Sequence, residues 1–377
     1  MNEEKENKIT LYPSNWLYNA GVVGFVRSIE IIENQLDKTY LDTDGRAHIE
    51  AQLFDELDVK RRYFSEDKIS SIIGNAPIYR NYLQSSWKDA FPHFVKSLRN
   101  IRENSNINCG LCLQKFSFDQ AEIDFLKNQG LSKFLEGITK LDVRFHNDIA
   151  PSQKFPNGFW NLNSSIPICY LCSFIIVHHH LALTTLQDNS QIFINAPSFK
   201  VMYHLNKFLG DIYTKQGAKD VRQILGMSVI EYATKIQATL GEWTGMNIEV
   251  VSKYRKKVAN TGNPNQDYKV EIDFFSLPYE IIRILSDKEI ANLLNSIGEF
   301  KVLNIVLDGK LTKLVEDAYR MLRIGLKPFN ERNKSEKEFL NDYLRLSTNR
   351  SKPFLVAQKM LKLYASIEEK NKKEVIL

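Results

Sequence analysis

The spacing of apolar residues predicts a short strand and a long helix at the start of the chain. Residues 9–12 (ITLY) alternate as a strand that Pro13 ends, and the next segment, NWLYNAGVVGFVRSIEIIENQL, has the spacing of a helix of about five turns. Ser14 or Asn15 can cap this helix, because a side-chain oxygen there accepts from the free amides of the first turn. Gly21 and Gly24 lie on one face, where a neighbour can pack closely.

Most of the remaining pattern predicts helices. Helix-like spacing covers 66–100, with breaks near Pro77 and Pro92, and AEIDFLKNQGLSKFLEGITKL at 121–141. Further helical segments are predicted over 198–241, 278–297, 311–326, 335–347 and 353–371. The runs SFIIVHHHLALTTL and QIFINAP fit either a helix or a strand, so their type stays open.

Residues 247–275 predict a β-hairpin, because two period-two runs flank a loop of Gly, Asn and Pro (TGNPNQ). The first strand contains SKYRKK, in which alternation places Lys253, Arg255 and Lys257 on one face and Tyr254 and Lys256 on the other. A basic ribbon of this kind can follow a phosphate backbone, with the aromatic ring stacking on a base. An ordinary strand edge protected by lysines gives the same pattern.

Composition and charge indicate a folded protein with a basic end. The chain has 377 residues, of which 43% are hydrophobic and 25% charged. Its longest apolar run, ICYLCSFIIV, is about half the length of a membrane helix, and the charged start MNEEKENK is not a secretory signal, so we expect a cytoplasmic protein with no membrane partner. The net charge is +5, but residues 309–377 alone have 16 Lys and Arg against 9 Asp and Glu.

The four cysteines carry the strongest chemical signal. They form two Cys-x-x-Cys pairs, CGLC at Cys109 and Cys112 and CYLC at Cys169 and Cys172. Each pair can place two sulfurs on one metal ion, and two pairs complete a tetrahedral thiolate site, for which zinc is the usual cofactor. An iron–sulfur cluster and unpaired core cysteines are the alternatives, while disulfides are disfavoured in a reducing cytoplasm.

These patterns predict an α+β fold with a mixed helical and β body, a zinc-closed insertion and a helical C-terminal region. The expected parts are 1–104 as the N-terminal part of the body, 105–175 as the zinc-binding subdomain, 176–277 as the rest of the body with the basic hairpin, and 278–377 as the helical region.

No motif indicates an enzyme. The sequence has no phosphate-binding glycine loop, no G-x-S-x-G and no H-E-x-x-H, and the metal site leaves no thiol for nucleophilic catalysis. Three consecutive histidines, 178–180, point in different directions in any regular structure, so we expect one or two of them at a surface or interface rather than all three on one ion. His146 and Asp148 could belong to a nuclease site, although no second motif accompanies them.

Smaller basic and aromatic groups supplement the hairpin as candidate nucleic-acid contacts. Arg61 and Arg62 precede Tyr63, and Arg80 follows Tyr79. Each of these groups also fits an ordinary charged helix face. The same holds for the helical run with Arg320, Arg323 and Lys327.

Taken together, the helix beginning NWLYNAGVVGFVRSIE and the two widely spaced Cys-x-x-Cys pairs resemble the large subunit of type I CRISPR interference complexes. The resemblance is to the subtype I-B branch, described by its paired CXXC-CXXC motif, and it rests on residues 10–30, 109–112 and 169–172. It implies zinc ligands at the four cysteines.

The resemblance also implies a non-catalytic role in a Cascade-type antiviral complex. Such a subunit lies beside the 5′ end of the crRNA guide, helps to recognise a short motif flanking the target in double-stranded DNA, and presents the complex to a separate helicase-nuclease. Its partners would be crRNA, target DNA, the other complex subunits and that helicase-nuclease. A metal-dependent nuclease or nucleic-acid-processing enzyme with a structural zinc, using His146, Asp148 and the histidine run, is the alternative. A zinc scaffold that binds only protein is a third.

Overall fold

The computed structural model describes residues 8–33, 41–64, 88–142, 165–186, 190–216, 226–227, 229–230, 248–257, 259, 268–344 and 353–375. The chain forms two compact units, the first from residues 1–203 and 251–274 and the second from 204–250 and 275–377. Helices combine with small sheets in the first unit, and helices prevail in the second, so the predicted α+β fold class is confirmed. The cysteine-bounded segment 105–175 lies within the first unit.

The N-terminal strand and helix form as predicted. They are β1 (Lys8–Leu11) and α1 (Trp16–Glu33), and the side chain of Asn15 accepts a hydrogen bond from the backbone N–H of Leu17 at 2.9 Å. Buried Asn19 donates to the Ser14 carbonyl and to the side chain of Asn195 at the end of β8 (Gln191–Asn195). The start of α1 is thereby fixed against a strand far along the chain.

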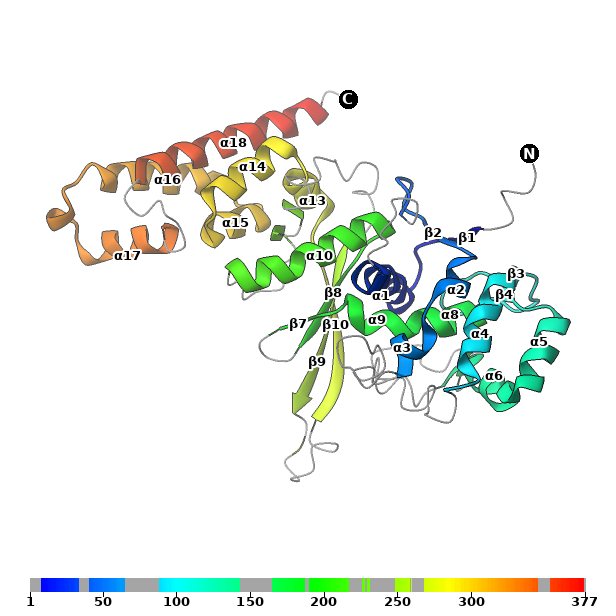
Figure 1. Cartoon of the computed structure of the whole chain (residues 1–377). Coiled ribbons are helices and arrows are strands. Elements are labelled where there is room, and N and C mark those ends of the chain that lie inside the picture. The colour runs from blue at the N-terminus through cyan, green and yellow to red at the C-terminus, as the bar shows by residue number, and fades with distance from the viewer. Residues whose placement is uncertain are drawn as a thin grey trace. The chain divides into compact units, whose positions relative to one another are not determined.

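The segment after the second cysteine pair is helical, which settles a choice that the sequence left open. It comprises α8 (Tyr170–Ile175), η7 (Ile176–His178) and α9 (His179–Ala182), and α1 packs against it; Figure 1 shows α1, nearly end-on, beside α9. A β-carbon at Gly21 would lie 2.8 Å from the Ile175 carbonyl oxygen, so no larger residue fits there without movement. The predicted close packing on this glycine face is confirmed.

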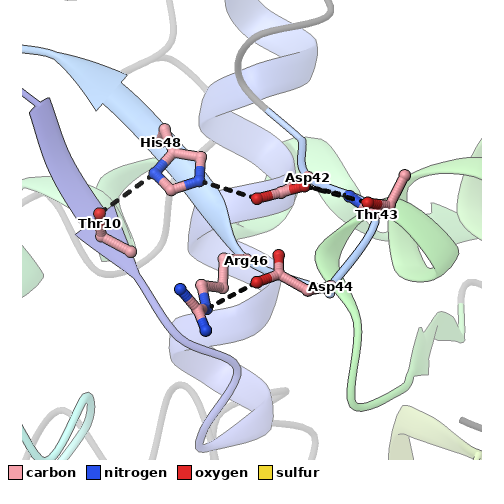
Figure 2. Close-up of polar contacts among 6 residues, drawn as sticks. All are labelled: Thr10, Asp42, Thr43, Asp44, Arg46 and His48. Carbon is pink, nitrogen blue, oxygen red and sulfur yellow. Dashed lines mark hydrogen bonds and ion pairs between the residues drawn. The ribbon is translucent and has the colours of Figure 1, made fainter.

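A hydrogen-bonded turn precedes β2 (Ala47–Glu50), which pairs antiparallel with β1. Figure 2 shows His48 between Asp42 and Thr10, with its Nδ1 3.1 Å from the Thr10 hydroxyl and its Nε2 3.4 Å from the Asp42 carboxylate. Thr10 and His48 are direct partners in the strand register, so their contact is a cross-strand pair that stabilises the sheet. Arg46 pairs with Asp44 in the same turn at 3.1 Å.

Helices α1 and α8 share an aromatic core with other short helices of the first unit. It involves α2 (Leu53–Glu56), α3 (Val59–Phe64) and α4 (Phe91–Ser97), followed by η5 (Leu98–Asn100). Edge-to-face contacts of 5.0 to 6.1 Å between ring centroids link the buried rings of this core. These rings are Phe25, Phe54, Tyr63, Phe91, Phe174 and His178.

The cysteine-bounded segment contains short antiparallel pairs and one interrupted helix. One pair is β3 (Arg102–Glu103) with β4 (Phe116–Ser117), and the other is β5 (Lys140–Asp142) with β6 (Ser165–Pro167). The predicted helix at 121–141 divides into α5 (Gln120–Leu126), η6 (Lys127–Leu131) and α6 (Ser132–Ile138). It breaks at Gly130, whose φ of 82° lies in the region that favours glycine.

The predicted hairpin strands are neighbours in a four-stranded sheet of order β10-β9-β8-β7. They are β9 (Glu249–Lys257) and β10 (Tyr268–Ser276), and β7 is Thr184–Thr185. Strand β9 lies between β8 and β10 in this order. Because β8 has five residues and β9 has nine, β8 cannot pair with the whole length of β9, and the alternative of lysines that protect a strand edge stays open. The predicted helix after residue 198 is present as α10 (Phe199–Gln216).

The second unit contains the helices predicted after residue 278 together with one that the pattern missed. They are α13 (Tyr279–Leu285), α14 (Lys288–Ile297), α15 (Phe300–Leu307), α16 (Thr312–Gly325), η9 (Phe329–Glu331), α17 (Lys334–Tyr343) and α18 (Pro353–Val375). Helix α18 packs along α14 and α16. The missed helix, α15, has the sequence FKVLNIVL, in which only Lys301 and Asn304 are polar, so its polar face is too short to give a clear helical pattern.

Polar contacts fix the ends of this bundle. Lys370 on α18 pairs at 3.0 Å with Asp287, which caps α14, and Asn333 forms a capping box with Glu336 at the start of α17. Within the part of the chain that the structure describes, no helix combines the length and apolar character needed to cross a membrane.

Candidate metal centre

The first cysteine pair lies in a tight turn between β3 and β4. The turn is closed by backbone hydrogen bonds from Cys109 to the Gln114 carbonyl at 2.9 Å and from Leu113 to the Cys109 carbonyl at 3.0 Å. Leu113 has a φ of 63°, the left-handed conformation that reverses the chain. The N–H of Leu111 points at the Cys109 sulfur, 3.4 Å away, so the backbone supports a negative charge there.

The second pair begins a helix. Cys169 occupies the N-cap position of α8, and its sulfur accepts a hydrogen bond from the Cys172 N–H at 3.3 Å. The residue type that usually accepts at this position is Ser, Thr, Asp or Asn, and here a sulfur takes that role. A thiolate at the N-terminus of a helix is also favoured by the partial positive charge of the free amides.

Strand pairing and one glycine bring the two pairs together. The β5–β6 pair continues into a hydrogen bond from Ile168 N–H to the Thr139 carbonyl, which leads directly to Cys169. Gly110 donates its N–H to the Pro167 carbonyl at 2.8 Å, and a β-carbon on Gly110 would lie only 2.0 Å from the Ile166 side chain. The first cysteine turn can therefore reach the second pair only with glycine at position 110.

The four sulfurs form one compact cluster. All lie within 4.8 Å of one another, and the sulfurs of Cys112 and Cys169 are 3.8 Å apart. Metal–sulfur bonds of about 2.3 Å in a tetrahedron require sulfur–sulfur distances of about 3.8 Å, so the observed spacing fits a single tetrahedral ion. The predicted meeting of the two pairs is confirmed, and the buried cluster could hold a metal ion.

Because the four cysteines are buried, their negatively charged thiolate forms need a cation beside them. Burial raises the pKa of the Cys172 and Cys169 thiols, while hydrogen bonds from the other three cysteines, Cys112 first, lower the pKa of Cys109 well below its usual range. The thiols thus share protons, and the metal-free cluster cannot hold four negative charges. A divalent cation supplies the missing positive charge and releases the protons.

Tyr18 of α1 is a polar group that the sequence analysis did not assign to the site. Burial, followed by the four cysteines, raises the pKa of Tyr18 well above its usual range. Its buried hydroxyl has no hydrogen-bond partner within the described residues. A neutral hydroxyl that feels the charge of the four cysteines is of the donor type that outer residues commonly offer around metals. The orphaned hydroxyl therefore fits a negatively charged metal–thiolate centre.

Only some of the residues predicted to contact nucleic acid have side chains that the structure describes. Lys253 is half-buried on β9 and close enough to His179 to contribute to lowering the pKa of that imidazole. Tyr254, Arg255, Lys256 and Lys257 continue β9, and Arg61 belongs to α3, but the side chains of these five residues lie outside the described part of the structure. Arg80 lies outside the described residues.

Arg62 does not occupy the surface position that was predicted. Its side chain has 0% exposure, and its Nη2 donates to the Ser28 hydroxyl at 2.6 Å. A phosphate cannot reach a guanidinium that is enclosed in this way, so the assignment of Arg62 as a nucleic-acid contact is wrong. The arginine instead connects α3 to α1.

The histidine run is also more buried than expected. His178 and His179 have 0% and 2% exposure, and His178 accepts at Nε2 from the Tyr63 hydroxyl, 2.9 Å away. Its Nδ1 lies 3.2 Å from the Ile175 carbonyl, which fixes the neutral tautomer. Burial lowers the pKa of both imidazoles well below the usual range. His178 and His179 therefore belong to the core of the first unit, whereas His180 is half-buried, so a surface or interface role stays open for His180 alone.

Comparison of the whole chain with protein-family models, with curated proteins and with solved structures finds no significant match.

Proposed function

We propose that the four cysteines bind one zinc ion and that the chain is the non-catalytic large subunit of a crRNA-guided type I CRISPR surveillance complex. The zinc assignment rests on the donor set, because four thiolates select soft or borderline metals and zinc is the usual occupant of closed tetrahedral sites. The compact sulfurs, all within 4.8 Å, favour one ion over an iron–sulfur cluster, which must fit several irons and sulfides between its thiolates.

A bound zinc ion would supply structure rather than chemistry. Four protein ligands leave no coordination position for water or substrate. The residues of this chain hold the two pairs in place, and the N–H groups of Leu111 and Cys172 support the negative charge on the sulfurs. The free cysteines and the absence of any disulfide among the described residues also suit the reducing cytoplasm that we propose as the location.

One observation carries the functional proposal. The segments on which the family resemblance rests, α1 and the two cysteine pairs, are distant in sequence but belong to one packed arrangement, in which α1 lies along the helix that Cys169 begins. Residues of the W-L-x-N-A-G stretch have distinct tasks there: Asn19 anchors the start of α1, and Gly21 allows close approach to Ile175. The resemblance is thus to a cooperating set of residues rather than to unrelated short motifs.

Charge and topology support a nucleic-acid partner. Strand β9 contains four basic residues, Lys253, Arg255, Lys256 and Lys257. The C-terminal part of the chain also has an excess of basic residues. Cationic ribbons bind phosphates, and the guide would read the target sequence while the protein reads the shape and a short flanking motif. In this proposal the chain contacts crRNA and target DNA, binds other subunits, and presents the complex to a helicase-nuclease.

No observation favours the alternative of a nuclease. Within the described residues, the four-cysteine cluster is the group of His, Cys, Asp or Glu side chains that could hold a metal, and it leaves no open position. His146 and Asp148 lie outside the described residues, and His178 and His179 are enclosed in the core.

Purification from the native cell tests the functional proposal. The tagged chain should copurify with a short RNA of uniform length and with a fixed set of proteins, and salt should release the RNA more readily than the proteins. A Cys172→Ser variant, which loses a metal ligand, should recover less of both. Recovery of the chain without RNA, or with RNA of random length, would overturn the proposal. Magnesium-dependent cleavage of RNA or DNA by the purified chain, abolished by His146→Ala, would establish the nuclease alternative.

A further inference from the structure

A cavity of about 280 Å³ lies against one side of the four-cysteine cluster. Its floor includes Cys109 and Cys169, its apolar wall includes Phe116, Ile168 and Tyr170, and polar residues with Lys140 complete the lining. The volume is near the lower end of the range for small-molecule sites, about 300 to 1,000 Å³, and is large enough for one planar base with its sugar. We propose that this cavity binds one nucleotide of a single-stranded nucleic acid.

The aromatic wall is held rigidly. Tyr170 stacks on Phe118 with ring centroids 4.8 Å apart and planes 17° apart, and its other neighbour, Phe94, contacts it edge-on. Its ring is therefore fixed while it remains half-buried at the cavity. Rigid aromatic rings are the usual platforms for bases in single-stranded nucleic acids.

Charge determines how a nucleotide would enter. A zinc ion with four thiolates has a net negative charge, so the side of the cavity lined by Cys109 and Cys169 repels phosphate and favours the N–H groups at the edge of a base. The cation of the lining is Lys140, which is exposed at the rim. Among the described residues, the side-chain ammonium of Lys140 has no hydrogen-bond or ion-pair partner. The base would therefore face inward along Tyr170, and the phosphate would lie beside Lys140.

The negative cysteine side of the cavity and the positive Lys140 together indicate which kind of molecule the cavity binds. An acidic peptide would match Lys140 but would leave the aromatic wall and the acceptor sulfurs without polar partners. A nucleotide matches all three features at once. This inference rests on the proposed function, since it specifies one contact of a chain that binds nucleic acid.

Binding of short oligothymidylate to the purified zinc-loaded chain, followed by fluorescence anisotropy, tests the inference. Tyr170→Leu should weaken binding about 5-fold or more, because stacking on an aromatic ring contributes about 1 to 3 kcal/mol per base. Lys140→Gln should reduce the slope of log affinity against log salt by about 0.7, the value for one phosphate on a single strand. Lys133→Gln, at an exposed lysine of α6 that does not line the cavity, is the matched control and should change neither quantity.

A second measurement uses the unaltered protein. A base over Cys109 and Cys169 shields their sulfurs, so thymidine 5′-monophosphate should slow the release of zinc by a mercurial thiol reagent, whereas inorganic phosphate should not. Unchanged release together with unchanged affinity of both variants would overturn the inference. An acidic peptide that protects the zinc while the nucleotide does not would also overturn it. Guide RNA copurifying equally with wild type and both variants would leave the proposed function standing while the cavity assignment fails.

Discussion

Gly24 lies directly against the backbone of His178: a β-carbon at position 24 would be 2.0 Å from the His178 carbonyl oxygen. The neighbour is backbone in a helical segment, so it cannot swing away as a flexible side chain could. This contact joins the N-terminal helix to the helical segment that begins at the second cysteine pair. Packing of α1 and order at the metal centre are therefore expected to depend on each other.

Replacement of Gly24 by alanine tests this dependence. The added methyl group forces α1 away from η7, and overpacking of this kind costs about 1 to 3 kcal/mol or more. We expect Gly24→Ala to lower the free energy of unfolding by about 3 kcal/mol, measured by urea denaturation. Gly137→Ala is the control, because no atom lies within 4 Å of a β-carbon there, and alanine is the better helix former by about 1 kcal/mol. Equal stability of the two variants would contradict the close contact.

The metal centre was predictable from the sequence because its ligands form local pairs. Each Cys-x-x-Cys unit defines its own turn, and four cysteines in two pairs leave few other arrangements. The residues that pack around the four cysteines have no comparable pattern in the sequence. Gly110 matters because Ile166 lies against it, and Tyr18 because α1 packs beside the cluster, and both relationships arise only from tertiary folding.

Buried polar residues were mispredicted for the same reason. Arg62 follows another arginine, and His178 has histidines after it, so each belongs to a polar run that normally faces water. Their burial depends on partners far away in sequence, Ser28 for the arginine and Tyr63 for the histidine. Lys140 and Tyr170 of the cavity were missed because they adjoin each other only after β5 pairs with β6.

Removal of the metal should destabilise the first unit strongly. Cys172 is fully buried, and without it the cluster has three thiolates that cannot close a tetrahedral site. We expect Cys172→Ser to reduce the zinc content from one ion per chain to a small fraction, measured by elemental analysis, and to lower Tm by about 10 °C or more. A chelator should produce a similar loss in wild type and little further loss in the variant. A wild-type chain with no zinc would contradict the assignment.

The buried histidines should make stability depend on pH. Burial lowers the folded-state pKa values of His178 and His179, whereas the unfolded chain has the usual value of about 6.5. The unfolded state therefore binds more protons below about pH 6.5, and stability that is present above this pH is lost as the pH falls through it. Each histidine contributes a slope of up to about 1.4 kcal/mol per pH unit.

Denaturation at several pH values measures this slope. His178→Gln keeps a hydrogen-bonding side chain but removes one titrating group, so it should reduce the slope between about pH 5.5 and 6.5 by about half. Zinc content must be followed in the same samples, because thiolate protonation also releases metal. A slope unchanged in the variant while zinc stays bound would show that His178 is not the group responsible.

The basic strand β9 gives the last prediction. The alternation of its sequence predicts that Lys253, Arg255 and Lys257 share one face and that Tyr254 and Lys256 share the other. We expect glutamine at the three basic positions of the first face to weaken duplex DNA binding and to reduce the salt dependence, by a slope of about 0.9 for each phosphate that the strand no longer neutralises. The double variant Tyr254→Leu with Lys256→Gln tests the opposite face, and it should change the salt slope by no more than one phosphate, because it removes a single positive charge. Because Lys253 lies close to buried His179, each variant must also show wild-type unfolding before binding is compared. Affinity that is unchanged across a salt titration in the triple variant would remove β9 from the nucleic-acid interface, and an equal loss in both variants would indicate an effect on the sheet rather than on phosphate binding.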